Sequence, residues 1–385
     1  MDLAARMDRL IAGLRPAGEV GDRVEQAIRA VPRHLFIPPV GLISPRRTGH
    51  AYVIDRDADP GAWWDAVYSD TSIVTQLDDG ATGLRDLKGD YTSSASAPST
   101  VADLLSLLAP ERGDRVLEIG TGTGWTAALL AHLVGASGSV TSVEVDASIA
   151  EQAAKNLVAF GTPAHLVAGD GVDGCPDHAP YERVHVTCGI RTVPYAWIEQ
   201  SLPGAMIVLP YCPGFGTNHA LRLVVMPDGT AQGRIPGFAS YMIMRSQRRA
   251  ADRPARGPAD EHHLTTRIDP RTIAEAPAGA DLAISALTGL SSNGSAEPDE
   301  DGPLYRMWVS DPDDPYSWAA VDWRPGVSEY EVYQVGDRPL WDEVTEAYAR
   351  WVSWGEPDYR RFGMTITPEG QRIWLDRPER VLGKP

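Results

Sequence analysis

The chain has 385 residues, of which 43% are hydrophobic and 23% charged, and its formal net charge at pH 7 is −17. This length supports two or three domains with buried cores, and the excess of acidic residues argues against a protein that binds duplex nucleic acid through a basic face. The chain has three cysteines, too few for a disulfide-built scaffold, and their spacing does not fit a zinc site.

The first 31 residues carry two helical patterns. In the second, DRVEQAIRAV, the apolar residues Val24, Ala27, Ile28 and Val31 share one face. The start, MDLAARMDRL, lacks the basic and apolar regions of a secretory signal. No stretch approaches the roughly 18 apolar residues of a membrane helix. We therefore expect a cytoplasmic protein without a membrane span.

Residues 40–95 are rich in Gly, Asp and Ser and predict loops or short strands. A helix is expected to begin at Pro98, with Ser99 as its cap. From Arg115 onward, apolar strand patterns alternate with helical ones. The strand patterns are RVLEIG, SVTSVEV, AHLVAGD, ERVHVTC, AMIVLPY and LRLVVMP, and the helical ones are WTAALLAHLV and ASIAEQAAKNLVAF. This alternation predicts a doubly wound α/β domain with a parallel sheet and crossover helices.

The composition changes near residue 250. The segment RRAADRPARGPADEHH (248–263) has the composition of a linker. The 135 residues after position 250 hold seven of the 11 tryptophans and a net charge of −11, from 14 Lys or Arg and 25 Asp or Glu. SSNGSAEPDEDGP (291–303) predicts a mobile loop. We therefore expect a main domain over residues 1–250 and a smaller, acidic, tryptophan-rich α+β domain over residues 251–385.

A glycine-rich turn, within VLEIGTGTGW (116–125), lies between a predicted strand and a predicted helix. Gly120, Gly122 and Gly124 allow a sharp bend and a close approach of a ligand to the main chain. Their G-x-G-x-G spacing differs from the G-x-G-x-x-G that binds a dinucleotide pyrophosphate at a helix N-terminus. The turn therefore favours a ligand without phosphate groups, lying along the strand ends.

Acidic residues end or follow the next two predicted strands. Glu144 ends SVTSVE, where a carboxylate can accept hydrogen bonds from both hydroxyls of a ribose. Asp170 follows AHLVAG, where it can accept a hydrogen bond from the exocyclic amine of adenine. Ribose and adenine without phosphate indicate an adenosine cofactor, and S-adenosyl-L-methionine is the usual one of this kind. The main domain is therefore predicted to be a Rossmann-like class I methyltransferase domain.

Several segments outside the glycine turn resemble protein-L-isoaspartate O-methyltransferases. They are VPRHLFIP (31–38), YSDTSIVTQ (68–76), SSASAPS (93–99), GDG (169–171) and LPGAMIVLPY (202–211). The likeness covers roughly residues 20–245. It implies that Ser96 is the active-site serine, that Ser94 is the hydroxyl residue preceding it, and that TCGIRTVP (187–194) lines the substrate channel. The cofactor-binding residues expected from the motifs and their neighbours are Glu118, Gly120, Thr121, Gly122, Gly124, Glu144, Val145, Gly169, Asp170, Gly171 and Thr187.

The chain departs from the family pattern in two places. About 14 extra residues, LDDGATGLRDLKGD (77–90), precede the serine loop and are expected to alter the peptide channel. The residues after 250 are an addition for which we expect no counterpart in the housekeeping repair enzyme. The layout resembles family members dedicated to ribosomally made peptides, which are found beside lanthipeptide, lasso-peptide or ATP-grasp (graspetide) maturases.

This resemblance yields one leading hypothesis and two alternatives. In the leading hypothesis the enzyme esterifies an aspartate side chain in a precursor peptide, which leads to an aspartimide or an isoaspartate. Its partners would be that peptide, read by the C-terminal domain, and an earlier-acting ATP-grasp ligase or other cyclase. The first alternative is a general isoaspartate repair methyltransferase whose extra domain stabilises or dimerises it. The second is a binding module that escorts the precursor. No nucleic-acid, membrane or metal partner is expected.

Overall fold

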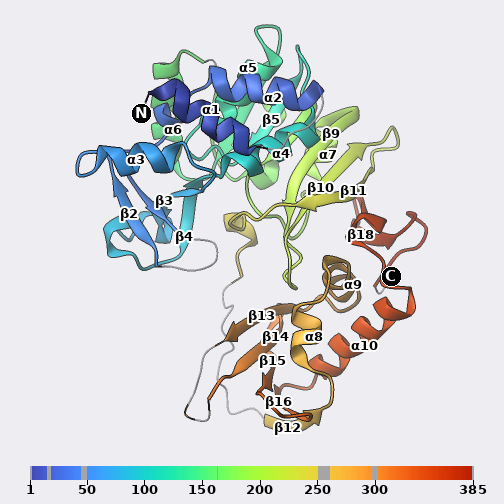
Figure 1. Ribbon diagram of the computed structural model, residues 1–385. Coiled ribbons are helices and arrows are strands. Elements are labelled where there is room, and N and C mark those ends of the chain that lie inside the picture. The colour runs from blue at the N-terminus through green and yellow to red at the C-terminus, as the bar shows by residue number, and fades with distance from the viewer. Residues whose placement is uncertain are drawn as a thin grey trace.

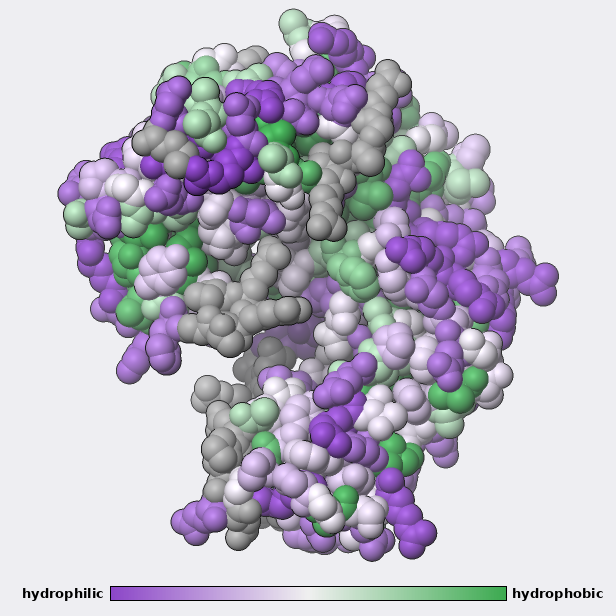
Figure 2. Space-filling model, in the orientation of Figure 1, coloured by the Kyte–Doolittle hydropathy of each residue, from purple (hydrophilic) through white to green (hydrophobic). Residues whose placement is uncertain are grey.

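The computed structural model describes residues 2–14, 19–44, 50–162, 164–249, 261–296, 300 and 302–383. Figure 1 shows a larger upper part, built on a nine-stranded sheet, and a smaller lower part, built on a five-stranded sheet. A four-stranded sheet lies at the side of the larger part. Hydrophilic residues cover most of the face seen in Figure 2. Of the helices in the described chain, none is long and apolar enough to cross a membrane.

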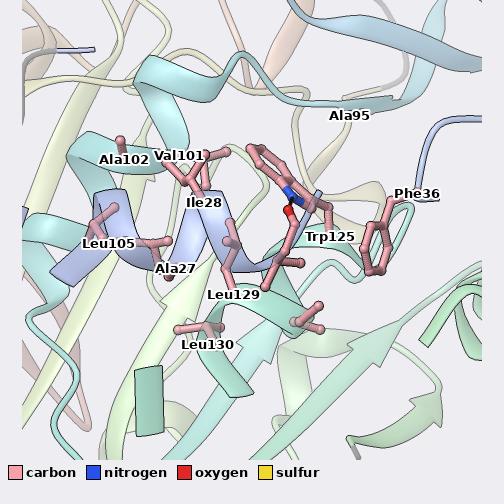
Figure 3. Close-up of a cluster of buried hydrophobic side chains, with 14 of the residues drawn as sticks. Ala27, Ile28, Phe36, Ala95, Val101, Ala102, Leu105, Trp125, Leu129 and Leu130 are labelled. Carbon is pink, nitrogen blue, oxygen red and sulfur yellow. Dashed lines mark hydrogen bonds between the residues drawn. The ribbon is translucent and has the colours of Figure 1, made fainter. Parts of the chain in front are cut away.

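The helices of the larger part are α1 (Leu3–Gly13), α2 (Glu19–Ala30), α3 (Pro60–Val67), α4 (Pro98–Leu108), α5 (Trp125–Val134), α6 (Ala147–Phe160) and α7 (Ala196–Glu199). The predicted apolar face of α2 is confirmed, because Val24, Ala27 and Ile28 are buried. This face packs against α4 and α5, as Figure 3 shows. Each of these two helices follows a loop of the predicted site, so this core holds both loops in place.

Residues 40–95, for which loops or short strands were predicted, contain a small antiparallel sheet of short strands. Its strands, in the order β2-β1-β3-β4, are β1 (Val40–Ile43), β2 (Tyr52–Asp55), β3 (Ile73–Leu77) and β4 (Tyr91–Ala95). Strands of four or five residues give too few alternating positions to be recognised one by one in a segment rich in polar residues. Strand β4 runs directly into the predicted serine loop.

The nine-stranded sheet confirms the predicted α/β class. Its strands are β5 (Arg115–Ile119), β6 (Ser139–Glu144), β7 (His165–Ala168), β8 (Tyr181–Val186), β9 (Ser201–Tyr211), β10 (His219–Val225), β11 (Ala231–Phe238), β17 (Phe362–Thr367) and β18 (Gly370–Leu375). They lie in the order β18-β17-β11-β10-β9-β8-β5-β6-β7. The pairings among β5 to β9 are parallel and those among β9, β10, β11, β17 and β18 are antiparallel, so the sheet is mixed where a parallel one was predicted. The parallel strands place their carboxyl ends at one edge.

The smaller part is an antiparallel sheet with helices, in agreement with the α+β prediction. Its strands, in the order β12-β16-β15-β14-β13, are β12 (Glu261–Thr266), β13 (Ser291–Ala296), β14 (Tyr305–Asp311), β15 (Asp314–Trp323) and β16 (Tyr330–Val335). Its helices are α8 (Pro270–Ala274), α9 (Ala278–Thr288) and α10 (Leu340–Ser353). The segment predicted as a mobile loop begins with β13, which pairs along its length with β14. Most of the predicted linker, residues 250–260, lies outside the described residues.

The two parts share a strand ladder and a core. β17 and β18, from the predicted C-terminal domain, extend the nine-stranded sheet through pairs such as Ala231 with Ile366. Phe362 and Trp351 belong to the same buried cluster as Val184 of the parallel sheet. The main-chain N–H of Thr217 donates to a carboxylate oxygen of Asp281 on α9, at 3.0 Å. The chain after residue 250 is therefore built into the main domain at its end.

Candidate active site

A cavity with about 930 Å³ of empty space lies at the carboxyl ends of the parallel strands. Its wall includes all predicted catalytic and cofactor residues except Glu118, Gly124 and Gly169. Those on the wall are Ser94, Ser96, Gly120, Thr121, Gly122, Glu144, Val145, Asp170, Gly171 and Thr187. The structure thus brings the serine loop and the glycine turn together, although their roles toward ligands stay predictions.

The glycine turn follows β5 and forms the floor of the cavity. Gly120 has a φ of +94°, and a Cβ there would lie 2.5 Å from the hydroxyl oxygen of Thr187. That hydroxyl donates to the carbonyl of Ile119 at 3.0 Å. The residue must therefore be glycine for two reasons, a left-handed backbone and a neighbour that leaves no room for a side chain. A ligand can then approach the main chain of the turn closely.

Glu144 ends β6 with its carboxylate fixed by two main-chain groups. The N–H of Gly122 donates to Oε2 at 2.9 Å, and the N–H of Asp146 donates to Oε1 at 3.1 Å. The residue is only 8% exposed, yet it lines the cavity. An ionised carboxylate has about four lone-pair sites, so capacity remains for the two hydroxyls of a ribose. This arrangement fits the predicted ribose contact.

Asp170 lies between β7 and a short 3-10 turn, Gly171–Asp173, which it caps. Its Oδ1 accepts hydrogen bonds from the N–H of Val172 (3.1 Å) and the hydroxyl of Ser246 (3.2 Å). Both bonds go to one oxygen, and within the described chain Oδ2 accepts none. Val145 lies nearby on the same wall and is 43% exposed. A free carboxylate oxygen beside an exposed apolar side chain suits the edge and face of an adenine ring.

Three predicted cofactor residues lie off the wall. Glu118 is completely buried beneath the floor, where the hydroxyl of Ser142 donates to its Oε2 at 2.5 Å. Burial raises the pKa of Glu118 to about 8. Gly124 is the N-cap of α5, and its left-handed backbone, with a φ of +87°, accounts for the glycine, since a Cβ there would meet Leu157 and Ala153 of α6 at ordinary contact distances. The N–H of Gly169 donates to the main-chain oxygen of Glu144.

The serine loop connects β4 to α4. Ala97 is the N-cap of α4 and Pro98 its first residue, so the predicted cap, Ser99, is wrong. The N–H of Ser99 instead donates to a carboxylate oxygen of Asp70 at 2.9 Å. Asp70 supplies the acceptor from another loop and favourable negative charge at the helix N-terminus. Ser96 is therefore not the cap of α4, and it lies on the cavity wall.

A segment after β11, absent from the sequence-based site, crosses the cavity. We call residues 241–248 the crossing segment; those lining the cavity are Tyr241, Met242, Ile243, Met244, Arg245 and Arg248. Its main chain pairs with the predicted channel segment, because the N–H of Gly189 donates to Met242 at 2.8 Å and the N–H of Met244 donates to Gly189 at 3.0 Å. Burial raises the pKa of Tyr241 to about 12, although its hydrogen bond with the Ser96 side chain acts in the opposite direction. The one feature of the sequence that marks this segment is a short apolar run, YMIM, at residues 241–244.

Ion pairs fasten the crossing segment to the inserted loop. Arg245 Nε lies 3.0 Å and Arg248 Nη1 2.8 Å from the carboxylate of Asp79. Arg245 also lies 2.9 Å from the carboxylate of Asp146, at the start of α6. Burial would raise the pKa of Asp146, but hydrogen bonds from Ser148, Gln76 and Arg245 hold it well below its usual value. The insertion at 77–90 is therefore fastened, through Asp79, to two residues of the cavity wall.

The electrostatics of the wall fit S-adenosyl-L-methionine better than a nucleotide. Glu144 and Asp170 on the wall are acidic, and the two arginines there are paired with Asp79 or Asp146. A pyrophosphate site usually places an unpaired cation next to a helix N-terminus, and the described wall offers no such pair, because both of its arginines are in ion pairs. A cavity with fixed carboxylates suits a cationic sulfonium with a ribose and an adenine.

Comparisons with known proteins agree with this geometry. Residues 71–232 match the family described as Protein-L-isoaspartate(D-aspartate) O-methyltransferase (PCMT). Protein-L-isoaspartate O-methyltransferase 2 of Archaeoglobus fulgidus is 33% identical over 245 residues, which cover 63% of this chain and 94% of that protein. The protein-L-isoaspartate O-methyltransferase of Aeropyrum pernix is 34% identical over 230 residues, or 59% of this chain and 73% of that protein.

One solved structure resembles nearly the whole chain. It is a protein-L-isoaspartate O-methyltransferase that aligns with a TM-score of 0.55 and 20% identity over 98% of this chain and 100% of its own. The likeness concerns the fold alone, but it extends past residue 250. At least one solved protein of that name therefore has a fold that extends over the C-terminal addition, whereas the Archaeoglobus fulgidus protein is matched over 94% of its length by only 63% of this chain.

Proposed function

The chain belongs to the protein-L-isoaspartate O-methyltransferase family, and on this premise we propose that it methylates the free carboxyl group of L-isoaspartyl residues in proteins or peptides. It is an S-adenosyl-L-methionine-dependent carboxyl O-methyltransferase with a class I methyltransferase fold. The observation that carries the proposal is that Ser96 and the cofactor residues line one cavity. The isoaspartyl substrate, first treated as the alternative, is better supported than a precursor peptide, because the similar proteins named above are isoaspartate methyltransferases.

The main task of the enzyme in this reaction is to position the substrate carboxylate. The free carboxyl group of an isoaspartyl residue is an α-carboxyl group with a reference pKa of about 3.5, so it is already ionised at neutral pH and no general base is required. When bound, S-adenosyl-L-methionine supplies an activated methyl group. The hydroxyl of Ser96 can donate to one carboxylate oxygen and leave the other directed at that methyl group, about 3 Å away. A neutral donor is preferable to direct contact with Lys or Arg, which would stabilise the charge that the reaction consumes.

The ester formed in this way can react further without the enzyme. The amide nitrogen of the following residue attacks the ester carbonyl, expels methanol and closes a succinimide ring. Hydrolysis of that ring opens it to aspartate or isoaspartate. The enzyme's own contribution therefore ends with the methyl transfer, and its specificity is decided by which carboxylate reaches Ser96.

Mass spectrometry of two matched peptides tests the proposal. One peptide contains L-isoaspartate and the other L-aspartate at the same position. We expect wild-type enzyme to add one methyl group to the first only. Ser96→Ala should slow this transfer on the order of 100-fold, because a positioning hydrogen bond is lost, while S-adenosylhomocysteine binds unchanged. Ser106→Ala, whose hydroxyl donates to Ala102 within α4, serves as the control. Methylation of the aspartyl peptide alone would refute the proposal.

The inserted loop favours a second candidate, esterification of an aspartate side chain in a ribosomally made precursor peptide. Asp79 of this loop is paired with the crossing segment at the cavity, so the loop is placed to restrict which peptides enter. Such an ester would lead to an aspartimide or isoaspartate, after an earlier cyclase such as an ATP-grasp ligase. The same assay decides, with an Asp-containing precursor encoded beside this gene as a third substrate. Methylation of that precursor, with none of the isoaspartyl peptide, would establish this candidate.

A further inference from the structure

Arg33 is a buried cation next to the serine loop, in a segment to which the proposed mechanism assigns no role. It begins a 3-10 turn, Arg33–Leu35, that follows α2, and it is 1% exposed. Burial lowers its pKa to about 10, so its guanidinium still carries a full positive charge at neutral pH. Burying a charge in this way is unfavourable unless hydrogen bonds or an opposite charge compensate it.

The guanidinium connects two segments through their carbonyl groups. On one side, Nη1 donates to Val67 at 3.0 Å and Nη2 to Thr71 at 2.9 Å. On the other side, Nη2 donates to Ala95 at 3.2 Å and to Ser96 at 2.9 Å. A planar guanidinium presents its donors in a fixed fork, so these bonds define the position of the Ala95–Ser96 main chain relative to the segment before β3.

These partners are neutral, and the charge of Arg33 is not matched by a carboxylate. Within the described chain no ion pair at 4.0 Å or less involves it. Asp70 acts on it only as a more distant charge, and that carboxylate is occupied by the N-terminus of α4. Carbonyl dipoles solvate a cation but do not cancel its charge, so Arg33 contributes a positive potential at the main chain of Ser96, which the more distant Asp70 offsets only in part.

Trp125 completes the wall around this cation. The guanidinium carbon lies 5.4 Å from the centroid of the Trp125 ring, and the indole N–H donates to the carbonyl of Val31 at 3.0 Å. Figure 3 shows Trp125 inside the buried cluster, together with Phe36 and Ile28. Trp125, Ala95 and Ser96 all line the cavity. The cation is therefore held immediately behind the wall where a substrate carboxylate would meet the serine.

We propose that Arg33 is a positioning residue for methyl transfer. Its hydrogen bonds fix the main chain of Ser96, and its charge, which is not in an ion pair, favours binding of a carboxylate at that serine. The inference rests on the proposed transfer to a carboxyl group. Because Arg33 is separated from the substrate by the main chain of the loop, its charge assists binding of the anion without replacing the neutral Ser96 hydroxyl as the direct donor. Loss of its charge should therefore raise KM, and loss of its fork should lower kcat.

The decisive probe is a pair of peptides that differ only in charge. One carries L-isoaspartate with its free carboxylate, and the other carries the carboxamide in its place. Binding is measured by calorimetry with S-adenosylhomocysteine present. We expect Arg33→Gln to weaken binding of the carboxylate peptide about 10-fold or more and binding of the carboxamide peptide less than about twofold. S-adenosylhomocysteine affinity should not change. A structural defect alone would weaken both peptides equally, and that result would overturn the proposal.

Arg33→Lys separates the fork from the charge and covers the case in which the glutamine variant fails to fold. Lysine keeps the charge but lacks the planar fork, so we expect kcat to fall about 10-fold with KM nearly unchanged. An unaltered kcat would overturn the positioning role. Arg222→Lys is the matched control, since Arg222 is partly buried and donates to the carbonyl of Leu107 at the other end of α4. If the wild-type enzyme does not methylate the isoaspartyl peptide, the proposed function is refuted instead.

Discussion

The carboxyl group of Glu118 lies beneath the cavity without reaching it. Its Oε2 accepts from Ser142, whose hydroxyl lies 2.6 Å from that of Thr121 on the cavity wall. Within the described chain, Oε1 has no hydrogen-bond partner. Burial, with the charge of Glu144 as a smaller contribution, raises the pKa of Glu118 to about 8. The group is therefore protonated in the folded protein at neutral pH and supports the floor as a neutral acid.

This shift predicts a pH-dependent gain from Glu118→Gln. The pKa of the folded state, about 8, lies above the ordinary value of 4.5, so the folded chain must keep a proton that the unfolded chain releases. Stability from this group is present below the ordinary pKa and is lost as the pH rises to the folded value. Glutamine cannot ionise and still accepts from Ser142. We expect its melting temperature, relative to wild type, to rise by roughly 2 °C or more between about pH 5 and pH 8.

Thermal unfolding of matched variants checks this expectation. Glu151→Gln is the control, because Glu151 is an exposed residue of α6 whose carboxylate pairs with Lys155. Its substitution should give no gain at higher pH. The buried Asp281, whose pKa burial raises to about 6, contributes to the pH dependence of every variant and cancels in the difference. A difference between Glu118→Gln and wild type that stays constant with pH would show that Glu118 is ionised in the folded protein.

Some residues of the site are positioned by the strand or turn next to them in the sequence, and others by contacts with distant parts of the chain. The glycine turn, Glu144 and Asp170 could be placed from the sequence, because residues that follow parallel strands meet at one edge of a sheet. Tyr241 and the role of Arg33 could not. Arg33 donates to carbonyl groups 34 to 63 residues further along the chain, and carbonyl groups leave no trace in side-chain patterns.

At the scale of elements, the inserted loop is joined by ion pairs to the crossing segment, which lines the cavity. The loop is held by its own contacts: Asp78 accepts from the main-chain N–H of Asp90 at 2.7 Å and from the hydroxyl of Thr82. Asp78 and Asp79 both have left-handed backbones, with φ of +46° and +52°. This conformation presents the Asp79 carboxylate to Arg245 and Arg248. The insertion therefore supports a segment of the cavity wall, and we expect this support to slow the exchange of a bound ligand.

Asp79→Asn should weaken that support. The substitution removes the charge from two ion pairs while keeping the size of the side chain, and Arg245 retains its pair with Asp146. Since partly exposed ion pairs contribute about 0–1 kcal/mol each, we expect S-adenosylhomocysteine to dissociate about two- to fivefold faster. Stopped-flow fluorescence measures this rate. Asp90→Asn is the control in the same loop, since within the described chain its side chain makes no hydrogen bond. Equal rates in both variants and wild type would exclude a role in ligand exchange.

At the scale of the whole molecule, local patterns predicted the elements better than their connections. The parallel strands β5 to β9 and their helices were predicted because alternating periods of strand and helix dictate one topology. The pairing of β17 with β11 was not predicted, since it joins residues more than 120 positions apart in the sequence. No local periodicity encodes such a pairing. The predicted boundary at residue 250 reflects a real change in composition, but the sheet continues across it.

This shared sheet changes the expected result of truncation. From the sequence, removal of residues 251–385 should affect peptide recognition more than stability. In the structure, removal would leave β11 unpaired on one side and would expose Val225, Ala231 and Ile235, which share a buried cluster with Phe362. Unpaired, apolar edge strands promote aggregation. We therefore expect the 1–250 fragment to aggregate or to lose S-adenosylhomocysteine binding, as measured by gel filtration and calorimetry.

Single substitutions in the full chain test the same coupling without a new edge. Phe362→Ala empties a fully buried position in the cluster shared with the parallel sheet. It should destabilise the S-adenosylhomocysteine-binding part by about 3–5 kcal/mol. Val309→Ala, buried in the separate cluster of the five-stranded sheet, should affect that part less. S-adenosylhomocysteine should raise the melting temperature of the part that contains the shared cluster, and Phe362→Ala should lower that temperature more than Val309→Ala does. A monomeric 1–250 fragment with full affinity would instead mean that β17 and β18 only cover a domain already complete without them.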